Sequence, residues 1–179
     1  MNTVLKLAAV AAALLTAPAF VLLSDTWNLD PAYAIKFSGT KAEGTFSGLT
    51  GRLVFDPANL PAANMAVEVA AATIKTGNTI KDGHARGASW FDVAKYPKIS
   101  FRSTAFSPAN TGYVVRGDLT LHGITKPVSI PFQFTQQAEK GLFAGRFRMN
   151  RKDFDINGNF FGFTVGEDFE VELRVPVAR

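Results

Sequence analysis

The sequence predicts an all-β protein, a closed antiparallel barrel of eight strands. Apolar and polar residues alternate through long segments from residue 67 onward, as in strands with one buried and one solvated face. No strong helical pattern is present that could cover the apolar face, so the strands must cover it with one another. Short connections at residues 108–110, 122–125 and 138–141 are typical of antiparallel neighbours. A sheet closed on itself meets these observations.

The two faces are most distinct in the later strands. Phe143, Phe147 and Met149, for example, alternate with Arg146 and Arg148. An even number of antiparallel strands allows the first to pair with the last, which leaves no exposed edge. The expected strands cover residues 27–38, 44–55, 65–73, 98–107, 111–121, 126–136, 142–150 and 168–177.

Two connections, residues 74–97 and 151–167, are much longer than hairpin turns, and such lengths are usually functional. The first lies between strands three and four. It is expected to hold a short helical segment after Asn78 or Thr79 and then a turn at residues 89–93. The second is too apolar for a plain solvent loop, because it contains Phe154, Phe160, Phe161 and Phe163. Both are expected to close one end of the barrel or to flank its mouth.

The first 23 residues are typical of a secretory signal peptide, with Lys6 followed by a nearly unbroken apolar run. Cleavage is expected after Ala19, at a pattern of small residues. An uncleaved membrane anchor is the alternative, since the run approaches spanning length. Either outcome predicts an exported protein, periplasmic or secreted, in which residues 24–179 form one domain.

The absence of cysteine excludes disulfides, a thiol nucleophile and cysteine-ligated metals. The net charge of +4 comes from basic residues scattered among acidic ones, which does not favour nucleic-acid binding. One basic cluster, Arg146, Arg148, Arg151 and Lys152, is expected on a solvated outer strand face. A transient contact with anionic lipid headgroups of a membrane is the alternative for this cluster.

Asp82, His84, Asp92 and His122 are the residues most able to perform acid–base or metal chemistry. No nucleophile motif or metal-ligand spacing accompanies them, so no catalytic residue, metal or cofactor is expected. Asp82 and His84 are candidates for a local turn hydrogen bond or for contact with a ligand headgroup, and His122 is expected to satisfy backbone groups in a hairpin turn. A small hydrolase or isomerase that uses His84 and Asp82 is a further alternative.

The 16 phenylalanines could simply fill a small barrel. Apolar clusters also occur in both long connections, however, and this distribution favours an open pocket. Such a pocket would bind a long tail through buried apolar area, about 25 cal/mol per Å². The residues expected to line it are Trp90, Phe91, Phe101, Leu119, Leu121, Phe132 and Phe163.

A series of short motifs occurs in order along the chain. They include Trp27-Asn28-Leu29-Asp30-Pro31, Trp90-Phe91-Asp92-Val93-x-x-Tyr96-Pro97, Leu119-Thr120-Leu121-His122-Gly123-Ile124-Thr125-Lys126-Pro127 and Arg151-x-Asp153-Phe154. Together the motifs resemble the YceI-like family over nearly the whole chain after the signal segment. The resemblance implies a lipocalin-like eight-stranded barrel, secretion to the periplasm and binding of a polyisoprenoid or related long apolar molecule in the barrel.

The resulting hypothesis is an exported, non-enzymatic carrier or storage protein for an isoprenoid-type lipid, such as a polyprenyl compound or a quinone. The alternative is a filled barrel without stored ligand that acts through its surface, as an accessory or stress-response subunit of a membrane redox protein. The sequence leaves the oligomeric state open, a homodimer included.

Overall fold

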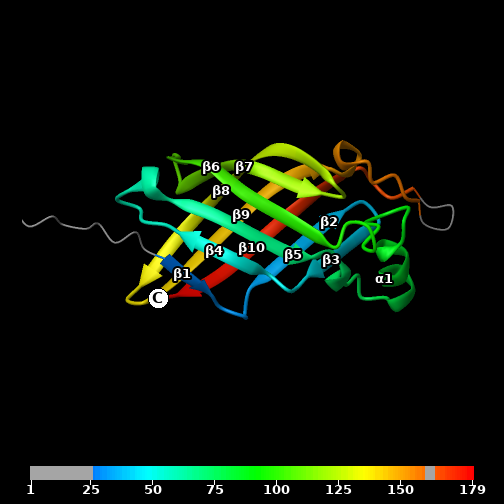
Figure 1. The fold of residues 1–179 in the computed structure, drawn as a ribbon, viewed down its shortest axis with the longest axis horizontal. Coiled ribbons are helices and arrows are strands. Elements are labelled where there is room, and N and C mark those ends of the chain that lie inside the picture. The colour runs from blue at the N-terminus through cyan, green and yellow to red at the C-terminus, as the bar shows by residue number, and fades with distance from the viewer. Residues whose placement is uncertain (1–25, 160–163) are drawn as a thin grey trace, which may run out of the picture.

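The computed structural model describes residues 26–159 and 164–179, which fold into a β-barrel with short helices at its ends (Figure 1). The strands are β1 (Thr26–Leu29), β2 (Ala34–Gly39), β3 (Ala42–Phe46), β4 (Thr50–Val54), β5 (Asn64–Ala70), β6 (Lys98–Pro108), β7 (Tyr113–Leu121), β8 (Ile124–Gln137), β9 (Lys140–Asn150) and β10 (Asp168–Ala178). The helices are α1 (Thr79–Arg86) and the 3-10 helices η1 (Leu60–Ala62), η2 (Ala71–Thr73) and η3 (Arg151–Phe154). None of the helices in these two ranges is long and apolar enough to cross a membrane.

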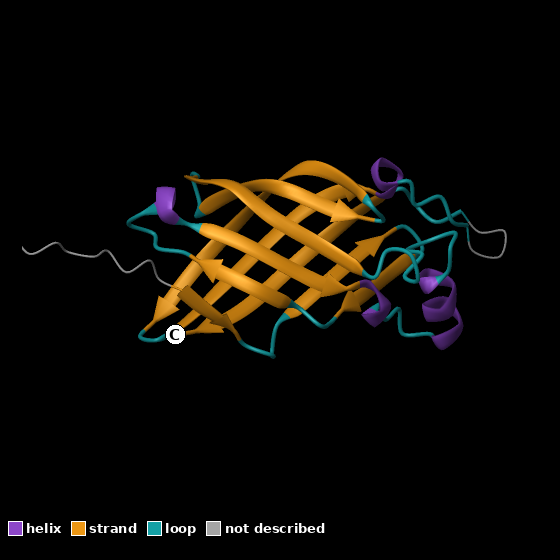
Figure 2. Ribbon diagram, in the orientation of Figure 1, coloured by secondary structure: helices purple, strands orange, loops and turns teal. Residues whose placement is uncertain are grey.

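Eight strands close the barrel, so the predicted eight-stranded antiparallel architecture is confirmed (Figure 2). Strands β4 to β10 pair in sequence order, and β1 completes the ring by pairing with both β4 and β10. The closing register places Leu29 opposite Val177, so the first strand pairs with the last as expected. β2 and β3 are additional strands, because β2 pairs with β10 beyond β1 and β3 pairs with β2.

The first two expected strands are each interrupted, so the prediction that they run unbroken is wrong. Between β1 and β2, the Asp30 carboxylate accepts a hydrogen bond from the Ala32 amide at 2.8 Å. Pro31 has no amide N–H to give to a ladder, and together these features make a local turn. Between β3 and β4, Gly48 has a φ of 77°, in the left-handed region that breaks a strand.

A β-bulge in β6 lies between Ser103 and Ala105. It shifts the alternation by one residue. Phe106 is five positions after Phe101 and would face outward in a regular strand, but with the bulge both side chains pack in the core. The Ser103 hydroxyl accepts a hydrogen bond from the Met65 amide at 2.8 Å, which ties the bulge to β5.

A cluster of rings closes the barrel at the end where β1 begins and β10 ends, and we call it the aromatic plug. Phe55 at its centre is 0% exposed, with five other rings at centroid distances of 5.1–5.7 Å. The indole N–H of Trp27 donates to the carbonyl oxygen of Phe55 at 2.9 Å. The plug comprises Trp27, Phe55, Phe106, Tyr113, Phe132, Phe134 and Phe143.

The opposite end, which we call the mouth end, carries α1 and η3 with the long connections that contain them (Figure 2). This location confirms the expectation that both connections lie at one end of the barrel. Helix α1 begins where the sequence predicts, because the Asn78 side chain accepts hydrogen bonds from the amides of Ile80 at 3.0 Å and Lys81 at 3.1 Å.

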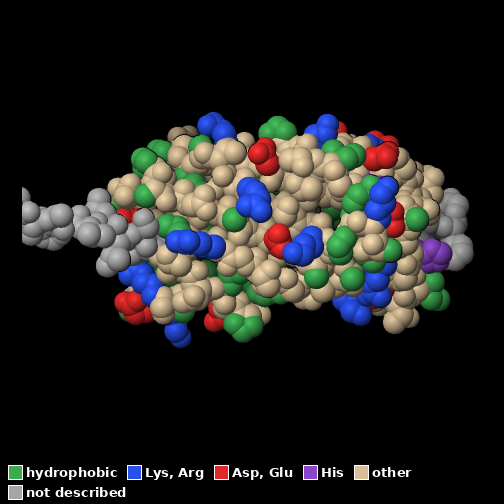
Figure 3. Space-filling model, in the orientation of Figure 1, with side chains coloured by type: hydrophobic (Ala, Val, Ile, Leu, Met, Phe, Trp, Pro, Cys, Tyr) green, Lys and Arg blue, Asp and Glu red, His purple; other side chains and the backbone are tan. Residues whose placement is uncertain are grey.

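Basic and acidic side chains are interspersed on the outer surface (Figure 3). On the outer face of β9 and β10, Arg146 lies 3.3 Å from a carboxylate oxygen of Glu170 and 3.5 Å from one of Glu172. Arg148 lies 3.8 Å from Glu170. These two arginines occupy the solvated face expected for them.

Candidate functional site

The barrel encloses an apolar cavity of about 540 Å³, a volume within the range of small-molecule sites. The barrel interior is therefore hollow between the plug and the mouth end. The exposed residues Lys41, Lys81 and His84 also lie on the cavity wall, so the cavity opens to solvent at the mouth end. Inward-facing side chains of the strands form its sides, among them Leu53, Met65, Val67, Val69, Ile99, Val115, Ile130, Phe147, Met149, Val171, Leu173 and Val175.

Six of the seven residues expected to line a pocket lie on this wall: Trp90, Phe91, Phe101, Leu119, Leu121 and Phe132. The seventh, Phe163, lies outside the described residues. Alternation therefore assigned the inner faces of β6, β7 and β8 correctly. That these side chains contact a ligand stays a prediction.

Phe101 forms a mid-barrel part of the wall and lies over the backbone of the neighbouring strand. It is 6% exposed and pairs with Leu119 of β7. A Cβ atom on Gly117 would lie 2.5 Å from the Phe101 ring and 2.3 Å from the Arg102 carbonyl oxygen. Only glycine leaves room for the ring at that position.

A second group of rings surrounds the mouth. The rings of Phe91 and Phe46 lie 5.5 Å apart edge to face, and Phe37 lies 5.5 Å from Phe46 and 6.0 Å from Phe169. These contacts join the β2–β3 hairpin to the connection after α1 and to the start of β10. The cavity thus lies between aromatic rings at both ends.

Trp90 joins the two long connections to each other. Its ring lies 5.2 Å from the guanidinium carbon of Arg151. A Cβ atom on Gly158 would lie 2.4 Å from the indole, so Gly158 permits the ring's close approach. In the turn after β7, Nδ1 of His122 lies 3.0 Å from the carbonyl oxygen of Phe154, so the ring contacts a backbone group as expected, although of η3 and not of its own hairpin turn.

Arg151 departs from its predicted place on the outer surface, because it is 3% exposed and lies on the cavity wall. The prediction that it shares the solvated face of Arg146 and Arg148 is wrong. Nε donates to the carbonyl oxygen of Gly166 at 3.0 Å and Nη2 to that of Val165 at 3.2 Å, and Nη1 donates to Ile156. Burial lowers the pKa of the guanidinium, and the charge of Glu167 opposes that shift.

A signal for this position was present in the sequence. Phe147 and Met149 face inward, and continuing their alternation by two residues places Arg151 on the same side. Proximity along the chain groups Arg151 with Arg146 and Arg148, whereas the period of the strand, extended past its end, separates it from them.

Asp82 serves the loop before α1. It is 4% exposed, and its Oδ1 accepts hydrogen bonds from the amide of Thr76 at 2.7 Å and from its hydroxyl at 2.8 Å. Lys75 lies 3.5 Å from Oδ2. The hydrogen bonds from Thr76, and secondarily the charge of Lys75, hold the pKa of Asp82 below its usual range. Of the two headgroup candidates, His84 lies on the cavity wall, whereas Asp82 is not among the described residues that line it.

Within residues 26–159 and 164–179, no three His, Asp or Glu side chains lie close enough together to hold a metal ion. The geometry supports binding: a long apolar cavity, with its polar groups at one end.

An eight-stranded antiparallel barrel with a hollow apolar interior is a lipocalin-like fold. Comparison with known families defines it further, because the sequence profile of the YceI-like domain matches residues 27–177. The chain belongs to the YceI-like family.

Individual proteins agree with this assignment. A UPF0312 protein of Vibrio cholerae is 35% identical over 121 residues, which cover 64% of each of the two chains. The matched region thus spans about two thirds of that relative's length. The solved structure of BcnA from Burkholderia cenocepacia superposes with a TM-score of 0.77 at 23% identity, over 83% of this chain and 99% of BcnA. A polyisoprenoid binding domain from Saccharophagus degradans superposes with a TM-score of 0.65 at 14% identity, over 87% and 98% of the two chains. At these identities the two structures show a shared fold.

Proposed function

We propose that this protein is an exported, non-enzymatic carrier or storage protein that holds one long-chain isoprenoid-type lipid, polyprenyl or quinone-like, in its cavity. The single observation that carries the proposal is the apolar cavity of about 540 Å³, open at the mouth end. The similar fold of a protein named as a polyisoprenoid binding domain supports the same ligand class.

The wall chemistry suits a hydrocarbon tail. A tail gains about 0.8 kcal/mol for each methylene that it removes from water, and few polar groups on the wall have to be desolvated in return. Because association costs several kcal/mol of translational and conformational freedom, a long tail is favoured over a short one.

Binding without catalysis is supported by where the reactive side chains lie. The one histidine on the described cavity wall, His84, is at the exposed rim, and Asp82 is engaged by Thr76. A hydrolase would need a nucleophile and a base within hydrogen-bond reach inside the cavity. Export rests on the apolar leader of residues 1–23, and we propose that residues 24–179 act as one domain.

Native mass spectrometry of protein purified from its own host, followed by lipid extraction, tests the proposal. The expected result is an apolar molecule with a long tail, bound one per chain. Protein stripped of lipid should take up an added polyprenol or quinone. Folded protein that is repeatedly recovered empty and binds neither compound would favour the alternative of a barrel that acts through its surface.

A further inference from the structure

Arg151 is the one buried charge on the described part of the cavity wall. The other charged residues there, Lys41, Glu43 and Lys81, are exposed at the rim, as is His84. A guanidinium stays protonated in proteins, so this charge persists inside an otherwise apolar enclosure.

Among the described residues, this charge is balanced only in part. Three backbone carbonyl oxygens accept hydrogen bonds from Arg151, which accounts for three of the five N–H groups that a guanidinium carries. Within the described ranges no carboxylate lies within 4.0 Å of it, and Glu167 acts on it only through its charge. A buried cation without a paired anion is costly, and an anion that reached it would be strongly held.

The position of Arg151 matches one end of an extended ligand. Strand β9 runs along the cavity from Phe143 in the aromatic plug to Met149, and Arg151 follows at the mouth end. A tail lying along β9 with its tip against Phe143 would have its head beside Arg151. Trp90 stacks on the guanidinium and limits its motion.

We infer that the cavity takes a single-chain lipid with an anionic headgroup, a phosphate or a carboxylate, and that Arg151 binds this headgroup. The inference rests on the proposed function, since it requires a lipid in the cavity. Among long-chain lipids it predicts a preference for an anionic headgroup, so that a prenyl phosphate or a fatty acid would bind more tightly than the neutral alcohol with the same tail.

Pairs of probes that differ only in the headgroup test the inference. Calorimetric titration of the stripped protein compares farnesyl monophosphate with farnesol, and dodecanoate with dodecanol. Charge-assisted hydrogen bonds are about twice as strong as neutral ones, so each anion should bind at least about tenfold more tightly than its alcohol. The prenyl and alkyl pairs together distinguish a phosphate source from a carboxylate source.

Two controls separate Arg151 from the rim. Arg151→Gln should abolish the preference for the anion while binding of the alcohol persists, and Lys81→Gln should retain the preference. Because Arg151 also donates hydrogen bonds to three backbone carbonyls, the Arg151→Gln variant could fail to fold. In that case a salt series on the wild-type protein distinguishes Arg151 from the rim lysines as the source of the preference. Raising the salt to about 1 M shortens the screening length to about 3 Å, so a preference set by rim lysines would vanish and one set by a buried guanidinium would survive.

The outcomes are distinct. Equal binding of anion and alcohol, or a preference that follows Lys81 or disappears with salt, would overturn the inference and leave the proposed function standing. Failure of all four probes to bind would count against the proposed function itself.

Discussion

Phe101 and Gly117 show how a single missing side chain shapes the cavity wall. The Phe101 ring occupies the space that a Cβ on Gly117 would take, at 2.5 Å, and backbone lies at 2.3 Å on the same side. The ring therefore lies close against the backbone of β7 at Gly117, on the cavity wall.

Gly117→Ala is accordingly expected to destabilise the protein by about 1–3 kcal/mol, the usual cost of overpacking. Gly83→Ala is the matched control. A Cβ at this position would have no heavy atom within 4 Å, and Gly83 lies within helix α1, where alanine is the better helix former. That variant should be neutral or up to about 1 kcal/mol more stable. Urea denaturation measures both, and equal effects would contradict this account of the wall.

Phe101→Ala is expected to cost about 3 kcal/mol, toward the lower end for a buried phenylalanine, because one side of the ring already faces a cavity. Phe101→Trp should instead obstruct a tail and reduce lipid uptake with a smaller loss of stability. The measurements are denaturation of stripped protein and titration with a polyprenol. If Phe101→Trp changes neither, the ring does not contact the ligand.

Asp82 predicts a pH dependence. The folded-state pKa of Asp82 is lowered, so its charged carboxylate stabilises the folded state at every pH above the unfolded-state pKa of about 3.9. This contribution to stability is lost as the pH falls through the folded-state pKa. Asp82→Asn should therefore be less stable than wild type at neutral pH, and the difference should narrow toward about pH 3. Asp118→Asn, on the exposed face of β7, is the control. A constant difference across the pH range would show that the charge is not what stabilises the fold.

At the scale of elements, α1 depends on its cap. Asn78→Ala removes two hydrogen bonds to the first turn and should destabilise the helix by about 1 kcal/mol. Asn59 is a matched control, because it caps η1 without a side-chain hydrogen bond. Hydrogen exchange should accelerate in residues 79–86 of the first variant, with no comparable change at η1 in Asn59→Ala. Unchanged exchange in α1 would mean that tertiary contacts alone hold it.

The elements also show what alternation can and cannot predict. It assigns the inner faces of β9 and β10, because most inward apolar residues there, such as Phe147 and Val171, have outward charged neighbours. It misses the interruptions at Pro31 and Gly48, where local backbone chemistry overrides an otherwise continuous strand pattern. Extended by two residues past Met149, alternation also places Arg151 inside, but residue type predicts the opposite, because a charge at the end of a strand is expected in solvent.

For the whole molecule, composition could not determine whether the barrel is filled or hollow. The answer depends on where the phenylalanines gather. Phe55, Phe106, Phe132, Phe134 and Phe143 pack against one another at one end, which leaves smaller aliphatic residues around much of the remaining interior. That distribution arises from strand register and stagger, which depend on contacts between distant segments.

A ligand that fills this space should change the stability of the entire domain. At a free concentration of 100 times Kd, a polyprenol should add about 2.7 kcal/mol to the free energy of unfolding, and the melting temperature should rise with ligand concentration. Differential scanning calorimetry of stripped and reloaded protein measures this rise. A melting temperature that does not respond to ligand would argue against occupancy of the folded barrel.

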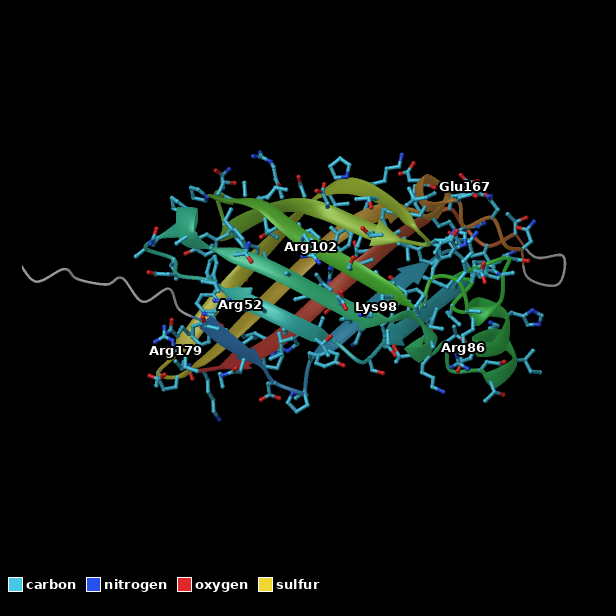
Figure 4. All side chains as sticks on the ribbon, in the orientation of Figure 1. Arg52, Arg86, Lys98, Arg102, Glu167 and Arg179 are labelled. Atoms are coloured by element: carbon cyan, nitrogen blue, oxygen red, sulfur yellow. The ribbon has the colours of Figure 1, made fainter. Side chains whose placement is uncertain are left out.

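The pairing of β1 with the end of β10 has a practical consequence for orientation. Asn28 lies opposite Ala178, and the Arg179 guanidinium is 4.6 Å from the Trp27 ring, so the carboxyl terminus leaves the molecule beside the plug. Figure 4 shows Arg179 at the opposite end from Arg86, which lies on α1. A linker fused after Arg179 would therefore attach the barrel to a sensor chip, a bead or a bilayer with its opening turned outward. Binding and release of a lipid could then be followed on immobilised protein, because the support would lie at the end opposite the cavity opening.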